Sequence, residues 1–508
     1  MPLPVERHMN YHTGFQVTLV LFLLCPITLF SQGLNNVWLG GFDSDGPPPF
    51  GGVDLDFQSG SMVVSTMSRD IGFRRTAANI SRSNGDLLFS TNGSFIADAY
   101  GDTLLNGYGL NPSNYTSNYP EGLFVSQACL ILPKPGSSAL YYLFHLTVDS
   151  FQPNYFALQL YRTTVDMDLN GGLGATVAIN EVVISDSLVA GRITAVRHAN
   201  GRDWWVLCHR RASNIYYRLL VTPEGLSNPM QQAIGVARTY AGGQTCFSPQ
   251  GDKFANYWGM ASEDLEVFDF DRCTGLLSDP VHIVINDSDN QGGVAFSPNG
   301  RYLYVSSIED VYQYDTEAPD IAASMVHIAE WDGTYSPFPP FATLFDIAQL
   351  APDGKIYIGT GNSTDKLHVI HNPDEPGLAC NMEQHGITLP RYFSNSLPNH
   401  PNYHLGPVDG SVCDSLGINE GMGEHDVQLA LSAYPNPSTR SFTLAYAVQP
   451  TSGALEVRDV SGRLVLREKL PAWSQVHRVE LEGEAAGMYQ CRLAWGATSA
   501  TVRVVLEP

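Results

Sequence analysis

FSPNGRYLYV, residues 296–305, consists of an apolar residue, a Ser-Pro-Asn-Gly turn and a strand in which aromatic residues alternate. Glycine suits the turn because it adopts positive φ without steric cost. The same phrase, a tight turn ending in glycine before a β-branched or aromatic strand, recurs roughly every 50 to 65 residues along the chain. The turn glycines are Gly85, Gly136, Gly201, Gly251, Gly300 and Gly354.

Short paired strands at a period near 50 residues predict a β-propeller, in which four-stranded blades stack in a ring and bury one another's faces. Residues 32–408 suffice for about seven such blades. We expect residues 36–60 to complete one blade by pairing with a strand near the end of the ring. A pair of β-sandwiches is the alternative fold, but sandwiches give no reason for this period.

The composition agrees with an all-β protein of two or more domains. The 508 residues are 44% hydrophobic and only 16% charged, with 47 Gly and 32 Pro. The formal net charge is −23, and such an acidic surface repels phosphate, so nucleic acid is not an expected partner. The acidity keeps an exported protein soluble; specific cation binding is the alternative interpretation.

The N-terminus carries a predicted signal peptide, residues 1–31. Its apolar run VTLVLFLLCPITLF, residues 17–30, has the length of a signal-peptide core and is too short for a comfortable membrane span. Ser31 is a plausible cleavage position. No second run of this kind follows, so we expect an exported mature chain without a transmembrane segment.

The C-terminal part differs from the repeat. Residues 409–428 are rich in Gly, Asp, Glu and Ser without a strong period, which predicts a linker. In residues 429–508 a Pro-Asn-Pro turn precedes several short strands with alternating apolar residues. Their number and length predict a small Ig-like β-sandwich.

The quoted motifs of this tail are YPNPS at 434–438, DVSGRLV at 459–465 and GMYQCRL at 487–493. They resemble the type A C-terminal sorting domain of the type IX secretion system of Bacteroidota. The resemblance implies recognition by the outer-membrane machinery of that system and export through the periplasm to the cell surface or the medium. The sorting-signal residues that it implies are Tyr434, Pro435, Asn436, Pro437, Gly462, Gly487 and Tyr489. As structure alone, the same residues are turn and core positions of a sandwich.

The repeat region also carries a resemblance. RITAVRHANGRDWWVLCH, residues 192–209, and LPNHPNYHLGP, residues 397–407, are similar to the propeller region of large Bacteroidota surface proteins that carry the same tail. The similarity spans much of residues 85–407. It implies the fold and no settled activity.

Cysteine usage fits export. Of the 8 cysteines, Cys25 lies in the predicted signal peptide, and export permits disulfides among the others. Proximity in sequence favours the pairs Cys246–Cys273 and Cys380–Cys413, although connectivity does not follow from sequence. Cys491, on an apolar strand face, is expected to be a buried free thiol. No Cys-x-x-Cys spacing occurs, so no zinc site is predicted.

A candidate ligand rim lies in the segment around residue 205. His198, Trp204, Trp205 and His209 cluster there, and sugars stack on aromatic faces. The alternative interpretation is a blade core in which the indole and imidazole groups are buried.

No motif predicts catalysis, a cofactor or a metal. The Gly-x-Ser-x-Gly elbow and the His-Glu-x-x-His helix are missing from the sequence. DMDLNGG, residues 166–172, imitates the start of a calcium loop, but Val177 stands where the loop needs a carboxylate. His368 and His371 are expected on opposite faces of a strand.

We therefore expect an exported propeller that binds an unidentified protein or glycan and is delivered by its C-terminal domain. The alternative is a propeller hydrolase or lyase, lactonase-like, whose active site at the channel mouth is assembled from separate blades. A structural part of a surface layer is a third reading. Convergent Asp, Glu and His at the mouth would favour an enzyme, and apolar plugging of the channel would favour binding.

Overall fold

The computed structural model describes residues 33–44, 46–150, 155–258, 265–285, 291–336, 340–394, 396–408, 410–413, 431–434, 436–446, 449, 451–472, 474, 476–496 and 498–507. The predicted signal peptide, residues 1–31, and most of the predicted linker, residues 409–428, lie outside these ranges. Within them no helix combines the length and the apolar character that crossing a bilayer requires.

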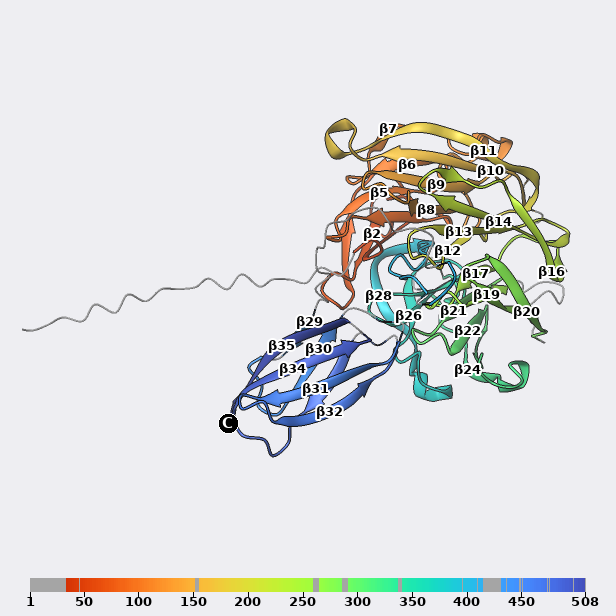
Figure 1. Ribbon diagram of the computed structural model, residues 1–508. Helices are drawn as coiled ribbons and strands as arrows, with labels where there is room; N and C mark the ends of the chain where they lie inside the picture. Colours follow the sequence, from red (N-terminus) through yellow and green to blue (C-terminus); the bar gives the residue numbers. More distant parts are fainter. Residues whose placement is uncertain are drawn as a thin grey trace, which may run out of the picture.

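Antiparallel strands follow one another in short groups along the first four-fifths of the chain, as predicted (Figure 1). The first three groups are β1 (Val37–Gly40), β2 (Gly52–Asp56) and β3 (Val63–Met67); β4 (Ala78–Ser81), β5 (Leu87–Thr91), β6 (Phe95–Asp98) and β7 (Thr103–Tyr108); and β8 (Cys129–Pro133), β9 (Leu140–Leu146), β10 (Phe156–Asp166) and β11 (Ala175–Val189). The outer strands β7 and β11 pair in parallel, which joins the second and third groups into one eight-stranded sheet.

The later groups repeat the same antiparallel order. They are β12 (Thr194–Arg197), β13 (Trp204–His209), β14 (Ser213–Thr222), β15 (Gly225–Leu226) and β16 (Met230–Arg238); β17 (Gln244–Phe247), β18 (Lys253–Tyr257), β19 (Leu265–Asp271) and β20 (Leu276–Ile283); β21 (Gly293–Phe296), β22 (Tyr302–Ser307), β23 (Asp310–Asp315) and β24 (Val326–Glu330); and β25 (Ala348–Leu350), β26 (Ile356–Gly359), β27 (Ser363–Ile370) and β28 (Met382–Ser394). Short helices interrupt them: α1 (Asn114–Asn118), η1 (Asn170–Gly172), η2 (Ala322–Ser324) and η3 (Gly377–Cys380).

The predicted turn glycines join the first two strands of six groups, from β4–β5 to β25–β26. All six have positive φ, between 69° and 91°. At two of them the missing side chain also permits close packing: a Cβ on Gly201 would lie 2.5 Å from the nitrogen of Pro407, and one on Gly251 would lie 2.7 Å from Leu405. We call the end of the ring that carries these glycines the turn end.

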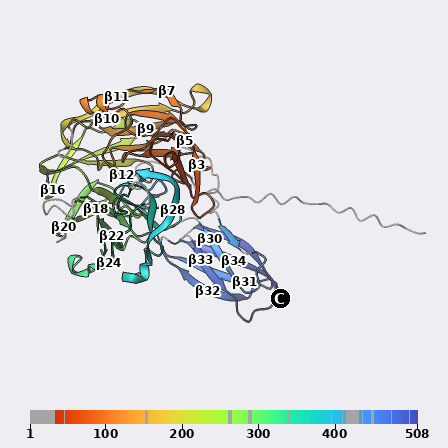
Figure 2. The same cartoon turned by 180° about the vertical axis from the view of Figure 1, so that it is seen from behind.

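The groups are arranged as a β-propeller (Figures 1 and 2). First strands of successive groups lie side by side, as β4 does with β8 and β17 with β21. The first strands of three groups begin at the same height along the ring axis: the side-chain oxygen of Gln244, at the start of β17, accepts from the amides of Val294 in β21 and Ala348 in β25. Each apolar cluster spans neighbouring groups; one unites Val267 of β19 with Leu303 of β22. The hydrophobic core therefore lies between the blades, where a single sheet could not bury both faces.

Ring closure differs from the expectation for residues 36–60. These residues form the separate sheet β1-β2-β3, and β25–β28 form a complete sheet without them. Ser81 N donates to Leu34 O and Phe73 N to Gly41 O, so β1 runs antiparallel to β4. The first strands of the other groups run in the same direction as β4. The group β1–β3 has no strand at the ring axis that runs in this direction.

Residues 396–408, which we call the axial segment, take that place. The segment begins beside the start of β4, where Asn399 N donates to Ala77 O, and ends at the turn end, where Val408 N donates to Ala199 O. It runs in the direction of the first strands and lies next to β1, with the rings of His400 and Trp38 6.4 Å apart. Pro398 and Pro401 lack the N–H that a ladder needs, so the segment is not a regular strand.

The C-terminal domain consists of two antiparallel sheets that share one apolar core. One is β29 (Leu431–Tyr434), β30 (Ser441–Tyr446) and β33 (Val476–Glu480); the other is β32 (Leu464–Leu470), β31 (Gly453–Asp459), β34 (Gly487–Trp495) and β35 (Thr498–Leu506). Cys491 is fully buried between them as a free thiol, as expected. The domain is a small β-sandwich, drawn in blue beside the ring in Figure 1.

Replacing Asn399 with Ala should lower the free energy of unfolding by about 3 kcal/mol, because three buried hydrogen bonds are lost. Asn399 Nδ2 donates to Cys129 O at 3.0 Å and to Ile193 O at 2.8 Å, and its Oδ1 accepts from Gln127. Asn402→Ala is the matched control: half-buried Asn402 donates to Pro249 O and accepts from the exposed amide of His404, and its loss should cost about 1 kcal/mol. Urea unfolding compares them, and equal losses would contradict the special role of Asn399.

Candidate functional site

The axial segment fills the centre of the ring, where a propeller enzyme would gather residues from separate blades. His400 Nε2 donates to Asn79 O at 2.8 Å, and the Tyr403 hydroxyl donates to Ile131 O at 2.8 Å. Both side chains are buried, and so is Leu405. The segment is therefore fixed to first strands on several sides by hydrogen bonds and apolar contacts.

At the turn end a guanidinium holds the segment as it leaves the ring. Arg272 Nε donates to Arg197 O at 2.8 Å, and its Nη2 donates to both His198 O and Gly406 O. Burial lowers the pKa of Arg272 to about 10, so the group remains charged at neutral pH. One buried cation thus joins the β12–β13 turn, the end of β19 and the axial segment.

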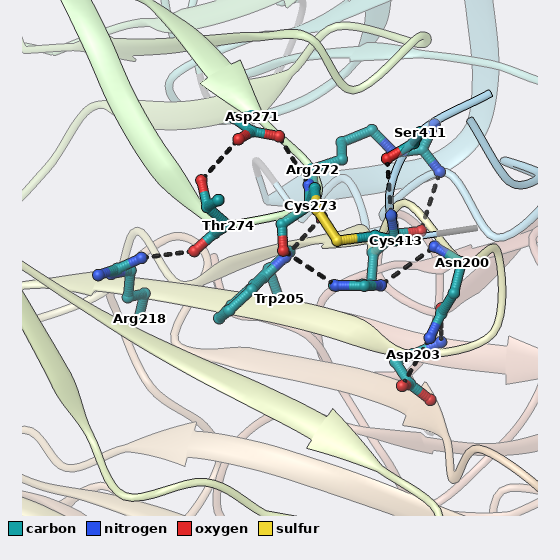
Figure 3. Close-up of a disulfide and its surroundings, with 11 residues drawn as sticks. Asn200, Asp203, Trp205, Arg218, Asp271, Arg272, Cys273, Thr274, Ser411 and Cys413 are labelled. Carbon is teal, nitrogen blue, oxygen red and sulfur yellow. Dashed lines mark hydrogen bonds between the residues drawn. A yellow bond between two sulfur atoms is a disulfide. The ribbon is translucent and has the colours of Figure 1, made fainter. Parts of the chain in front are cut away.

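A disulfide completes this attachment. Cys273 follows Arg272 and is bonded to Cys413, with the two Cα atoms 5.6 Å apart (Figure 3). The expected pairs Cys246–Cys273 and Cys380–Cys413 are wrong, since Cys246 and Cys380 are free thiols. Because the axial segment ends at the turn end of the ring, Cys413 lies close to Cys273. The two residues are 140 positions apart in the sequence, so their spacing does not predict the bond.

The candidate ligand rim is interior to the ring and supports the disulfide loop. His198 and Trp205 are only 3% and 4% exposed. Trp205 Nε1 donates to Arg272 O at 2.8 Å, as Figure 3 shows, and His198 Nε2 donates to Cys273 O at 3.1 Å. His198 Nδ1 accepts from the Asn200 amide, which sets the tautomer.

The other two residues of that cluster are also buried. Trp204 stacks under the Arg197 guanidinium at 3.9 Å and packs edge-on against Tyr403. His209 packs against Tyr216, with ring centroids 4.5 Å apart. The four residues form no exposed rim, because both faces of β13 are covered by neighbouring blades; the core interpretation is correct.

Elsewhere in the described ranges no group of three or more His, Cys, Asp or Glu side chains is placed to hold a metal ion. His368 is buried and donates to Leu344 O, whereas His371 pairs with Glu383 at the surface. Two cavities of about 360 and 280 Å³ lie away from the axis. Neither is lined by residues of the axial segment.

In the sandwich, the sorting-signal residues that are described have turn and core roles. Asn436 Nδ2 donates to Arg503 O and its Oδ1 accepts from Val505 N, which ties the segment before β30 to β35. Gly462 has a φ of 84° in the β31–β32 turn. Gly487 opens β34, and Pro437 is exposed. Pro435 and the side chain of Tyr434 lie outside the described part of the chain.

The β31–β32 turn is stabilised by charge. Asp459 accepts from the amides of Ser461 and Arg463, and the Arg463 guanidinium bridges Asp459 and Glu484. The hydroxyl of Ser461 and the guanidinium of Arg463 hold the pKa of Asp459 well below its usual range. Tyr489 is buried and donates to Ala485 O. The turn is therefore a rigid, exposed feature on a packed domain.

Residues 432–507 match a family model described as a secretion system C-terminal sorting domain. That domain marks proteins that type IX secretion exports, so the chain is a protein of the cell surface or the medium and its tail engages that machinery. No curated protein matches the chain.

Solved structures of similar fold include a proposed 6-phosphogluconolactonase from Bacteroides uniformis, at 13% identity and a TM-score of 0.43 over 70% of this chain and 97% of that one. A second proposed 6-phosphogluconolactonase, from Bacteroides fragilis, has 11% identity and a TM-score of 0.37 over 70% and 95% of the two chains. AztD from Citrobacter koseri has 12% identity and a TM-score of 0.29 over 88% and 98%. At these values the similarity concerns the fold and not the activity.

Cys413→Ser should lower the free energy of unfolding by roughly 4–5 kcal/mol in oxidising buffer, because the bridge closes a loop of 140 residues. Dithiothreitol should bring the wild-type protein down to the same value and should not change the variant. Cys380→Ser is the control that keeps the response to reductant. A reductant effect that survives in Cys413→Ser would contradict the assignment, as would a non-reducing peptide map linking Cys246 to Cys273.

Stability should fall as the pH drops from about 6.5 to 4, the range set by the ordinary histidine pKa and the lowered one. Burial lowers the pKa of His400 to about 4, so in this window the unfolded chain binds a proton that the folded chain does not. His400→Gln should therefore reduce the slope of unfolding free energy against pH by up to one proton. Burial lowers the pKa values of His145 and His368 to about 3, and in the His400→Gln variant these two residues should still contribute to the slope. His282→Gln, at an exposed histidine, is the control; an unchanged slope in His400→Gln would contradict the prediction.

Proposed function

We propose that the chain is an exported binding protein whose ring is a rigid scaffold for a protein or glycan site. The occupied axis carries this proposal. The axial segment passes through the position that a lactonase-like hydrolase or lyase would need for an active site at the channel mouth. The side chains of Asn399, His400 and Tyr403 donate to backbone carbonyls of the surrounding blades and are buried.

We propose further that the ring has seven blades, one for each strand group from β1–β3 to β25–β28. In this arrangement the axial segment substitutes for the first strand of the first blade. Binding would then use connections at the ends or outer edges of the blades, because rigid strands fix the positions of such loops.

Purified full-length protein tests the binding function. It should bind a component of a glycan array or an extracellular protein, and it should not hydrolyse 6-phosphogluconolactone. Turnover of that lactone, or of another lactone in a panel, together with no binding on the array or to extracellular proteins, would overturn the proposal in favour of the enzyme.

We also propose that the exposed β31–β32 turn is a part of the tail that the secretion machinery reads, and that the sandwich is Ig-like. Gly462 and Gly483 are both exposed turn glycines, with φ of 84° and 81° and no atom within 4 Å of a built Cβ. Gly462→Ala and Gly483→Ala therefore impose the same local strain. Gly462→Ala should reduce the extracellular fraction several-fold and Gly483→Ala should not; equal export of the two, by immunoblot of medium and periplasm, would contradict a signalling role.

A further inference from the structure

An off-axis cleft of about 280 Å³ lies at the end of the ring opposite the turn end. Its walls come from connections between strands: the segment after β1, the segment between β3 and β4, the β5–β6 turn and the segment before β8. Its lining includes Phe42, Asp43, Ser44, Asp70, Arg74 and Glu121. Gly72, Asn92, Phe95 and Pro120 complete the lining.

Two aromatic rings supply flat apolar walls. Arg74 lies over the ring of Phe42, 4.9 Å from its centroid, which fixes both side chains. Phe95 stacks on Tyr108 with a centroid distance of 5.7 Å and an interplanar angle of 29°. Tyr108 is 70% exposed, so this stacked pair is held at the surface and not in the core. One face of each ring is therefore occupied, by Arg74 and by Tyr108, and the other face is left for the C–H face of a sugar ring.

The polar groups are of the kinds that sugar hydroxyls need. The carboxylates of Asp43, Asp70 and Glu121 are exposed acceptors, and Arg74 is a donor. Asn92 fixes the spacing of two walls, because its Nδ2 donates to Gly72 O at 3.0 Å and to Glu121 O at 3.1 Å. The cleft is therefore largely preorganised.

One buried group in the lining lacks a protein partner. The Ser44 side chain is 3% exposed, and its hydroxyl oxygen makes no hydrogen bond within the described part of the chain. Such a hydroxyl costs stability unless a ligand or water pairs with it. Gly72 packs closely against the backbone of this segment: a built Cβ there would lie 3.2 Å from Asp43 N and 3.5 Å from Ser44 N.

We propose that the off-axis cleft binds an uncharged sugar unit of a glycan, an inference that rests on the proposed binding function. The aromatic walls would take the C–H face of the sugar, the carboxylates and Ser44 its hydroxyl donors, and Arg74 a hydroxyl or ring oxygen. Three carboxylates against one guanidinium leave the cleft acidic, which disfavours uronic and sialic acids. The volume is at the low end for ligand sites and suits roughly one or two sugar rings.

Saturation-transfer NMR of the full-length protein tests this with cellobiose, mannobiose and N,N′-diacetylchitobiose as neutral probes and digalacturonic acid as the anionic probe. At least one neutral probe should receive saturation and the anionic probe should not. Phe95→Ala and Asp70→Asn should each weaken binding at least tenfold. Tyr335→Ala and Asp168→Asn, which change an exposed aromatic ring and an exposed carboxylate outside the cleft, should leave it unchanged.

Unfolding temperatures of all four variants show whether each is folded, and a Ser44→Ala variant, which removes the unpaired hydroxyl, should fold and bind more weakly. No transfer to any neutral probe would overturn the cleft proposal, and so would transfer that survives both cleft variants or prefers the anionic probe. If the protein still binds an array glycan or an extracellular protein, the proposed function stands without this site. Lactone turnover without any binding would overturn both.

Discussion

The amide of Asn399 at the ring axis is the contact on which closure of the propeller depends. Its Nδ2 joins the carbonyls of Cys129 and Ile193, which precede or begin the first strands of adjacent blades. Gln127 bonds to Asn399 Oδ1 and to Thr245 O, which extends the connection to the next blade. Buried backbone groups must be paired, and here one side chain from the end of the ring pairs those of two adjacent blades at once.

This arrangement makes the ring a cooperative unit rather than an array of independent repeats. Axial residues contact groups as distant in sequence as Asn79 and Ile131. The core cannot be completed until residue 408 is available, and contacts of such long range form late in folding. The Cys273–Cys413 bridge then fixes the end of the axial segment. Export suits this order, because the bridge requires an oxidising compartment.

The sequence predicts the local structure well and the long-range pairings poorly. Turn glycines such as Gly300 reveal the blades because positive φ is a local requirement. The axial segment has no such signature: prolines 398 and 401 remove the strand pattern, so its place beside β1 follows only from the closed ring. The disulfide and the burial of Trp205 depend on that place, and neither spacing nor aromatic composition could identify them.

The off-axis cleft lies where the repeat is broken. The sheet β1-β2-β3 ends without a fourth strand at its outer side, and residues 68–77 lead instead to β4 across the end of the ring. Asp70 and Arg74 lie on this connection and line the cleft with Phe42 of the preceding blade. In the other groups a fourth strand occupies the outer edge of the sheet. The axial segment occupies the centre of the ring, where a propeller commonly has its site. The three-stranded first group provides the off-axis cleft instead. The same irregular group that the axial segment completes at the axis therefore also carries the proposed binding site.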